Sequence, residues 1–474
     1  MATTIAAQLE AVKSFAQSSD SQPLKRPFTR PSILFDPKVA ADIDIQTIWS
    51  IALQGLEFLI SSDERFKNYK NDLFSHRSIE LDRELMGIEE NNQINVSISS
   101  YLRLLSGYFV LPSSTKTLEY LIRRYKVHVY NTEDLILCAL PYHDTHAFVR
   151  MVHILDTRNT KWAFLDGVKE SGAPPPRKVI VQQCIQDKGI IDVLCSYASP
   201  TKKFQPSKNV ISFCTAVFIE VLGTVTMVDD DLVKRILPFV ISGLQPGIQG
   251  VSDHKAASLM IIGLLGNKVV LAPKLLNSLI RSIAEIARDE AKELTNLQWF
   301  RLSLIALINI IQSQKIDILP MKALEILKEI RNLAEILLEL SKEFNIDRFL
   351  FILLESLIDC SWSNEHSQQA LISIIEKVPM KNSVHYVVSK TLLSCVKLSQ
   401  KKDNSISSVS GGWPNNILIA VNKKYPSELR GAVHQFLQDN KVHSRKDDSV
   451  YKILCKMSDG NLACLAPSIG FLKY

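Results

Sequence analysis

The sequence has few of the residues that interrupt regular structure. Its 474 residues include only 17 glycines and 19 prolines, and charged residues make up 22%. Disordered chains and turn-rich β proteins carry more glycine, proline or charge than this. No sustained alternation of apolar and polar residues predicts strands, and no Asn-Gly pair predicts a tight hairpin. The composition therefore indicates a folded, helical protein.

The signatures of common catalytic and redox centres are also missing. The sequence has no G-x-S-x-G, H-E-x-x-H or kinase signature, and the glycines at Gly263 and Gly266 lack the spacing and the preceding strand of a phosphate-binding loop. The eight cysteines form no C-x-x-C pair and lie mostly in apolar helical runs, which is typical of reduced, buried thiols. We therefore expect no enzyme activity, no catalytic residue, no metal and no cofactor.

Two segments allow a second interpretation. His143, Asp144 and His146 could bind a metal, but the H-x-x-H spacing has no third ligand at a defined position, so a polar turn is favoured. Residues 210–228 are long and apolar enough to suggest a membrane span. An acidic residue at the centre, Glu220, would cost about 2.5–3.5 kcal/mol in a bilayer. We expect a helix buried within the protein and no membrane partner, with a membrane-associated helical protein as the less favoured alternative.

A spacing of 43 residues recurs in the middle of the chain. Similar runs of the form Ile-x-(Val/Leu)-(Leu/Ile)-(Gly/Asn) begin at Ile219, Ile262 and Ile305. Two helices per roughly 40–47 residues are typical of HEAT and armadillo repeats, each of which buries its apolar face against its neighbours. The sequence therefore predicts an all-α fold, an extended helical-repeat (HEAT/armadillo-like) solenoid, with Leu264 and Leu307 packed at repeat interfaces.

Breaks in the helical pattern divide the chain into six segments. The predictions are an N-terminal helix (1–17), a proline-rich basic tether (18–45), an N-terminal helical domain (46–198), HEAT-like repeats (206–398), a flexible insertion (399–416) and further helical repeat material (417–474). One amphipathic helix is expected from Pro320 to Phe344. The three acids Asp229 to Asp231 could hold a cation, but they are expected to cap the helix that follows and to interact with its dipole. The apolar final residues are unlike a terminal repeat, so we expect a truncated part of a longer array.

The stretch from Leu118 to His143 predicts a pair of helices joined by a turn. Apolar residues at steps of three and four predict one buried face: Leu118, Leu121, Ile122, Tyr125 and Val129. Charged residues fall outside that face and are expected to be exposed: Glu119, Arg123, Arg124 and Lys126. Thr132, with Glu133 or Asp134, would cap the second helix, and Pro141 would end it.

Two stretches of the chain resemble one protein family. The run LIRRYKVHVYN…LPYHDTHAFVRMVHIL from Leu121 and the run ILFDPK from Ile33 closely resemble the N-terminal part of the U3 small nucleolar RNA-associated protein ten family, also called HEAT-repeat-containing protein one. The resemblance extends over nearly the whole chain, and members of that family are much longer helical-repeat proteins. It implies a non-enzymatic scaffold of the small-subunit processome in the nucleus and nucleolus, acting in 18S rRNA maturation.

The partners implied by this resemblance are other processome proteins, the U3 small nucleolar RNA and the pre-rRNA. Cations are the candidate contacts because RNA is an anion: Lys25, Arg26 and Arg30 on the tether, Arg123, Arg124 and Lys126 on the helix pair, and Lys202 and Lys203 in a loop. The tether cluster could also be a weak nuclear-localisation element, and a solvated face is the usual interpretation of such clusters. From the residues alone, an importin-like adaptor that binds peptide segments is the alternative function.

Overall fold

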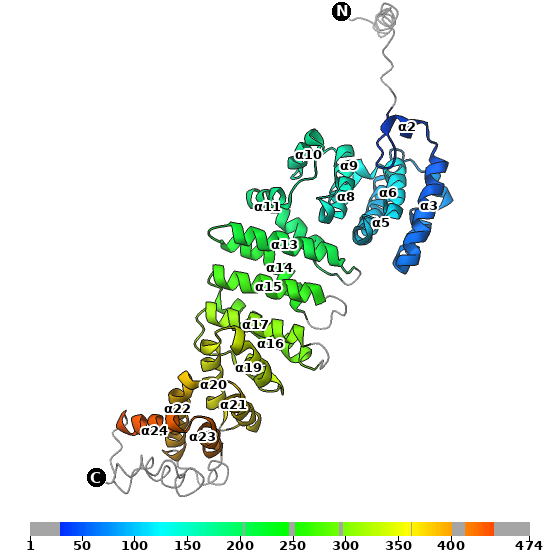
Figure 1. Ribbon diagram of the computed structural model, residues 1–474. Helices are drawn as coiled ribbons and strands as arrows, with labels where there is room; N and C mark the ends of the chain where they lie inside the picture. The colour runs from blue at the N-terminus through cyan, green and yellow to red at the C-terminus, as the bar shows by residue number, and fades with distance from the viewer. Residues whose placement is uncertain are drawn as a thin grey trace, which may run out of the picture. The chain divides into compact units, whose positions relative to one another are not determined.

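The computed structural model describes residues 29–201, 204–245, 252–292, 297–361, 363–400 and 413–439. In these ranges the chain forms 23 α-helices, α2 to α24, with short 3-10 helices and no strand (Figure 1). The helices pack in sequence as pairs, so the predicted all-α, helical-repeat fold is confirmed. Contacts divide the chain into two compact units, residues 1–217 and residues 218–474.

The first unit is built from short helices and two longer pairs. Its α-helices are α2 (Pro37–Asp42), α3 (Ile45–Ser62), α4 (Tyr69–Asp72), α5 (Ile88–Leu105), α6 (Pro112–Tyr125), α7 (Val127–Tyr130), α8 (Thr132–Ala139), α9 (His146–Ile154), α10 (Asp166–Ser171), α11 (Arg177–Gln186) and α12 (Gly189–Ala198). Helix α13 (Lys208–Thr224) runs across the boundary between the two units.

Helices α3 and α6 make the most extensive helix contact of the first unit. They approach closely at Gly55 of α3, where a Cβ atom would lie 2.7 Å from the backbone oxygen of Ser113. One face of α3 buries the side chains of Ile48, Ala52, Leu56 and Leu59. The absence of a side chain at Gly55 is therefore what lets the two backbones meet.

The predicted helix pair at Leu118–His143 is corrected in three respects. Helix α6 ends at Tyr125 because Lys126 adopts a left-handed conformation with φ 48°, and Val129 is 62% exposed rather than buried. Helix α6 packs chiefly on α3, while α8 packs on α5 and α9. The residue that flanks the start of α8 is Asn131, not Thr132. The expected end of the second helix is confirmed, because a 3-10 turn that contains Pro141 follows α8.

The predicted tether is not extended over the part that the structure describes. Residues 29–45 contain α2 and are fixed to α6, because one carboxylate oxygen of Glu119 accepts hydrogen bonds from the backbone N–H groups of Ile33 (2.9 Å) and Leu34 (3.1 Å). The stretch that begins at Ile33 thus contacts Glu119, two residues before the other stretch that carries the family resemblance. The predictions for residues 1–17 and 18–28 lie outside the described residues.

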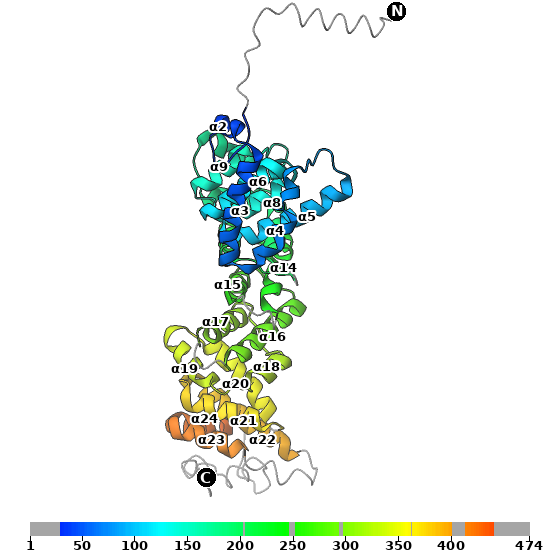
Figure 2. The ribbon, with the colours of Figure 1, turned by 90° about the vertical axis from the view of Figure 1, so that its right-hand side faces the viewer.

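The second unit is a regular array. Its helices are α14 (Asp230–Leu244), α15 (Ser252–Lys268), α16 (Pro273–Glu290), α17 (Gln298–Ser313), α18 (Met321–Leu327), α19 (Leu333–Glu343), α20 (Asp347–Ser361), α21 (Glu365–Lys377), α22 (Val384–Gln400), α23 (Trp413–Lys424) and α24 (Pro426–Asp439). Each even-numbered helix from α14 to α22 contacts the next even-numbered one, so these helices form one layer (Figure 2). In the other layer, α15 contacts α17, α19 contacts α21, and α21 contacts α23.

Side chains hydrogen-bond between successive repeats at two places in this unit. The amide of Gln314, just after α17, donates to the backbone oxygens of Gly266 (2.6 Å) and Val269 (2.8 Å), at the end of α15, and accepts from the N–H of Leu271 (2.8 Å). Lys424 at the end of α23 donates in the same way to Val378 (3.0 Å), after α21. The last carbonyl groups of a helix have no partner within the helix, and at the ends of α15 and α21 a side chain of the following repeat supplies one.

Three details of the predicted repeats differ in the structure. Leu307 is fully buried as predicted, but Leu264 is partly exposed, and its neighbour Leu265 is buried instead. The single helix expected from Pro320 to Phe344 is two helices, α18 and α19, separated by residues 328–332, and Phe344 is 47% exposed. Helix α23 begins at 413, inside the predicted insertion, of which residues 401–412 lie outside the described ranges.

Helix α14 begins with the predicted cap. Asp229 is its N-cap, and the Asp229 carboxylate accepts a hydrogen bond from the N–H of Leu232 (2.9 Å). The apolar run before it, residues 210–228, lies mostly in α13, which ends at Thr224. Across the described ranges, no helix is both long enough and apolar enough to cross a membrane.

Candidate nucleic-acid interface

The structure separates the predicted cationic contacts into three groups. Lys25 and Arg26 of the tether and Lys202 and Lys203 of the loop lie outside the described residues. Arg30 is described and exposed, and its charge lies close enough to Arg123 to act on the Arg123 pKa. The remaining three, on and after α6, differ sharply from one another in exposure.

Arg123 is buried, so the prediction that it projects outward is wrong. Its side chain is only 3% exposed and pairs with the fully buried Glu119, four residues earlier, at 3.7 Å. Its guanidinium also donates to the backbone oxygen of Ile43 (3.1 Å). Burial lowers the pKa of Arg123, and the charge of Glu119 opposes that shift. The apolar periodicity assigned both residues to the solvent face, whereas the docked segment 29–45 covers them.

Arg124 and Lys126 are more accessible. The half-buried Arg124 donates from Nε to the backbone oxygen of Ser78 (2.9 Å). Lys126 has a side chain that is 38% exposed and forms an ion pair with Glu84, whose hydrogen bond raises the pKa of Lys126. Of the three cations predicted on this helix pair, Arg123 and Lys126 are therefore paired with carboxylates, and Arg124 is bonded to a backbone oxygen.

A buried arginine that the sequence analysis did not single out holds this region together. Arg83 is 2% exposed and donates to the side-chain oxygens of Asn91 and Asn131 and to the backbone oxygen of Tyr125, at the end of α6. Its guanidinium lies 4.2 Å from the centroid of the Tyr130 ring. Burial lowers the pKa of Arg83. No spacing rule could identify this residue, because its partners lie on three separate segments.

A hollow of about 330 Å³ in the first unit is lined, among the described residues, by three cations and no carboxylate. Arg65 contributes from the 3-10 turn Glu64–Asn68, Arg103 from the end of α5, and Lys208 from the start of α13. The hydrogen bond from Arg65 to Asp63 lowers the pKa of that carboxyl group, and this ion pair balances the charge of Arg65. Arg103 is the lining arginine whose guanidinium is suited to bind an external phosphate group.

Arg103 lines this hollow and two others, and both of the others contain the carboxylate of Asp134. Its guanidinium lies 5.2 Å from the Tyr197 ring and 5.6 Å from the Phe204 ring, and no ion pair joins it to a carboxylate in the described part of the chain. On its other side a second hollow, of about 410 Å³, is lined by Glu133, Asp134 and Asp192. The electrostatic preference for an anion is therefore confined to the side of Arg65 and Lys208.

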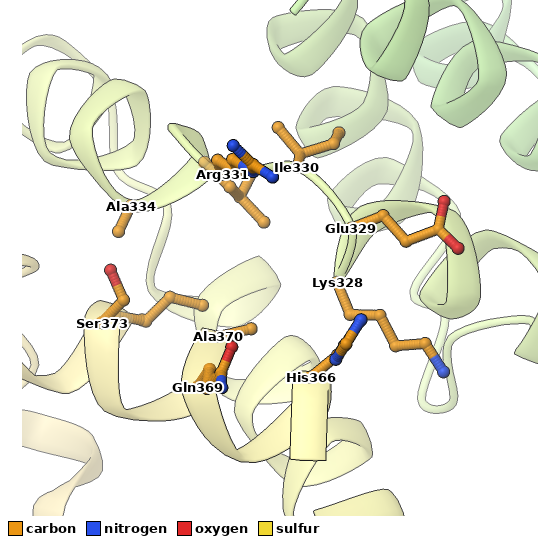
Figure 3. A pocket seen from close by; sticks show the side chains of 11 residues that line it. Lys328, Glu329, Ile330, Arg331, Ala334, His366, Gln369, Ala370 and Ser373 are labelled. Carbon is orange, nitrogen blue, oxygen red and sulfur yellow. The ribbon is translucent and has the colours of Figure 1, made fainter. Parts of the chain in front are cut away.

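A larger hollow, of about 520 Å³, lies within the second unit, between α21 and the interruption that separates α18 from α19 (Figure 3). Lys328, Arg331 and His366 contribute its basic groups, and Gln369 and Ser373 line the α21 side. Apolar periodicity could not indicate this hollow, because it predicted one uninterrupted helix at this position.

The histidines considered as metal ligands occupy a turn. His143 is 8% exposed, and its Nδ1 lies 2.8 Å from the backbone oxygen of Pro175. His146 opens α9 with Thr145 as the N-cap. Within the described ranges, no three His, Cys, Asp or Glu side chains gather in a way that could hold a metal ion. The polar-turn interpretation fits these positions.

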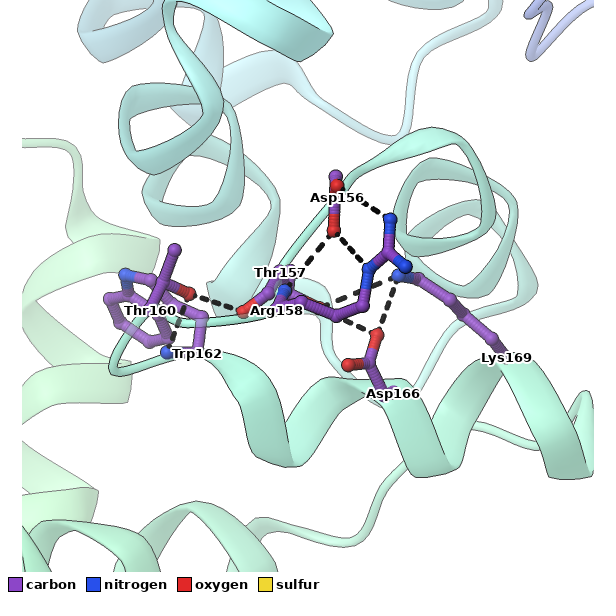
Figure 4. A network of polar contacts seen from close by, with 7 residues as sticks. All are labelled: Asp156, Thr157, Arg158, Thr160, Trp162, Asp166 and Lys169. Atoms are coloured by element: carbon purple, nitrogen blue, oxygen red, sulfur yellow. Dashed lines mark hydrogen bonds and ion pairs between the residues drawn. The ribbon is translucent and has the colours of Figure 1, made fainter.

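A polar network closes the turn between α9 and α10 (Figure 4). Asp166 accepts from the Thr157 hydroxyl (2.8 Å) and from Lys169 Nζ (2.6 Å), and Arg158 forms two hydrogen bonds to Asp156. The bonds from Arg158 lower the pKa of Asp156 to about 2. Every charge in this network is balanced internally, so we assign it to the stability of the turn rather than to a binding site.

Paired helices stacked in two layers, with cation-lined hollows in both units, define a helical-repeat protein, a class that binds partners over its repeat surfaces. A family model described as U3 small nucleolar RNA-associated protein 10 matches residues 232–357, from α14 into α20. The chain belongs to this family.

Relatives extend the similarity over almost the whole chain. An uncharacterized protein of Arabidopsis thaliana is 57% identical over 97% of this chain, and HEAT repeat-containing protein 1 of Danio rerio is 30% identical over 91%. U3 small nucleolar RNA-associated protein 10 of Yarrowia lipolytica is 30% identical over 53% of this chain. The matched regions cover 21%, 20% and 15% of those proteins, so the chain spans about a fifth or less of their length.

Proposed function

We propose that this chain is a non-enzymatic scaffold of the nucleolar small-subunit processome that contributes to 18S rRNA maturation. The observation that carries the proposal is membership of the family named U3 small nucleolar RNA-associated protein 10. The proposed partners are the U3 ribonucleoprotein, the pre-rRNA and other processome proteins, and the proposed location is the nucleolus. The role is geometric: the chain holds partners in position and makes or breaks no bonds.

The repeat architecture supports such a role. The side chains of Gln314 and Lys424 each tie one repeat to the repeat before it, which fixes the register at those two junctions. A surface of fixed register can hold several partners at constant separations, which a flexible chain cannot do without an entropic cost.

RNA contact is proposed at the hollow lined by Arg65, Arg103 and Lys208. Arg103 carries this proposal, since its guanidinium is flanked by two aromatic rings and lies beside two further cations. Guanidinium groups bind phosphates through paired hydrogen bonds. Of the two rings, only the partly exposed Phe204 is placed to stack on an unpaired base, because Tyr197 is buried. The predicted cations Lys202 and Lys203 come just before residues 205–209, which line this hollow. The other predicted cations that remain proposed secondary contacts are Lys25, Arg26, Arg30, Arg124 and Lys126.

An RNA-binding titration tests the hollow. Replacing Arg103 and Lys208 together by Gln should weaken binding of a 20-nucleotide single-stranded RNA and reduce the salt slope by about 0.7–0.9 for each phosphate group that is no longer bound. The matched control replaces Lys38 and Lys67, two exposed cations of the same unit away from the hollow, and should bind almost as the parent does. Equal affinity of all three proteins at every salt concentration would reject RNA contact at this hollow.

A further inference from the structure

The hollow of the second unit lies beside a turn that joins its two layers. Residues 328–332, Lys-Glu-Ile-Arg-Asn, connect α18, which ends at Leu327, to α19, which begins at Leu333 and packs in the other layer. Two cations of this turn, Lys328 and Arg331, line a hollow of about 520 Å³.

The charges around this hollow favour an anion. Lys328 and Arg331 form no ion pair within the described part of the chain, although most arginines of the second unit do, as Arg301 does with Glu343 and Arg348 with Asp317. His366 contributes a third basic group from the first turn of α21. The lining contains one carboxylate, Glu329, which lies on the side of Lys328 and away from Gln369 and Ser373 (Figure 3). The basic groups of the lining therefore outnumber its single carboxylate.

The residues that line the hollow suit a peptide better than they suit RNA. The described lining contains aliphatic residues, Ile330, Leu333, Ala334, Ala370 and Ile374, but no aromatic ring. Single-stranded RNA is bound through aromatic side chains on which the bases stack. Gln369 and Ser373 can instead hydrogen-bond to a peptide backbone, and the aliphatic wall can receive an apolar side chain. The volume suits a few side chains rather than a whole protein surface.

We propose that this hollow binds an acidic peptide segment of a partner protein, with Asp or Glu carboxylates on Lys328, Arg331 and His366 and an aliphatic side chain on the wall. Lys328 and Arg331 would contribute the charge-assisted hydrogen bonds, and Ala370 would border the apolar contact. This inference rests on the proposed scaffold function and deepens it by giving it a site and a class of partner.

Binding of a labelled peptide to the full chain tests the inference. The probes are a 12-residue peptide of Asp, Glu and Leu, the same peptide with Lys in place of the acids, and a 12-nucleotide oligouridylate, all followed by fluorescence anisotropy. The parent should bind the acidic peptide at least tenfold more tightly than the basic one. K328E with R331E should lose at least tenfold in affinity, and A370F, which changes no charge, should do so by occupying the hollow.

Exposed cations outside the hollow provide the control. K234E with K274E alters net charge equally and should change affinity less than threefold. Unchanged peptide affinity in K328E with R331E, absence of peptide binding, or oligouridylate that displaces the peptide would each overturn the inference. Association of these variants with U3 RNA in nuclei separates the two proposals: retained U3 RNA with no peptide binding contradicts only the docking site.

Discussion

The two units use different means to specify their packing. In the first unit the described buried residues include two charged ones, Arg83 and Glu119, with the Arg123 side chain packed beside Glu119. In the described part of the second unit, no Asp, Glu, Lys or Arg is buried, and the interior is almost entirely apolar. Burying a charge is costly unless it is hydrogen-bonded or paired, so such groups act through specific partners rather than through apolar area.

The two units are therefore held together by different kinds of contact. In the second unit each helix packs on neighbours in sequence, and an error at one interface affects mainly the adjacent repeats. In the first unit, residues far apart in sequence meet at single side chains, since Glu119 binds Ile33 across 86 positions. We therefore expect single polar substitutions to be most damaging in the first unit and apolar truncations to dominate in the second.

The largest effect is expected for Glu119→Ala. The change leaves the Arg123 charge buried without its carboxylate and removes the acceptor of two backbone N–H groups. Breaking a buried pair at one partner costs about 3–5 kcal/mol. Urea denaturation measures the loss, and limited proteolysis should show earlier cleavage near residues 29–45. Glu119→Gln, which keeps a hydrogen-bond acceptor, should lose less stability. Equal stability of the parent and both variants would show that Glu119 does not hold Arg123 and the segment 29–45 in place.

A loss of about 2–5 kcal/mol is expected for Leu307→Ala in the second unit, because a fully buried leucine leaves a cavity. The control is Leu264→Ala at the partly exposed position one repeat earlier, which should cost less than half as much. Urea titrations of the two variants compare them directly. A cost at Leu264 as large as that at Leu307 would show that the packing phase of α15 is misassigned.

The comparison of Leu264 with Leu307 also shows how far the sequence can predict this fold. Apolar periodicity identifies the repeats because stacked helices are neighbours in sequence, but α15 is apolar on so many sides that its buried face was misplaced by one residue. The left-handed Lys126 and the interruption at 328–332 carry no glycine or proline signal. Arg103 could not be paired with Tyr197 and Phe204 from spacing, because those rings come from segments much further along the chain.

A loss of about 1–3 kcal/mol is expected for Gly55→Ala, since the new Cβ would overlap the Ser113 carbonyl and force α3 and α6 apart. Gly223→Ala in α13 is the matched control, because no atom lies within 4 Å of the position that its Cβ would take, and alanine favours a helix by about 0.5–1 kcal/mol. Thermal denaturation should therefore give opposite shifts for the two variants. Shifts of the same sign would contradict the close approach of α3 and α6.

The smallest effect is expected from pH at the turn between α9 and α10. The pKa values of Asp156 (about 2) and Asp166 are lowered, the first chiefly by Arg158 and the second by Lys169. A lowered folded-state pKa gives stability that is present above the unfolded value, about 3.9 for Asp, and is lost as pH falls through the folded value. Fluorescence of the buried Trp162 should therefore remain constant above pH 4 and change below it. A change centred near pH 6 would point to a different group.

The scaffold role is tested most directly by measuring U3 RNA bound to the chain in nuclei. The tagged chain, purified under gentle salt and compared with an equally expressed tagged control, should enrich U3 small nucleolar RNA and pre-rRNA together with processome proteins, and imaging should place it in the nucleolus. A chain that stays outside the nucleolus and enriches U3 RNA no more than the control does would contradict the proposed function.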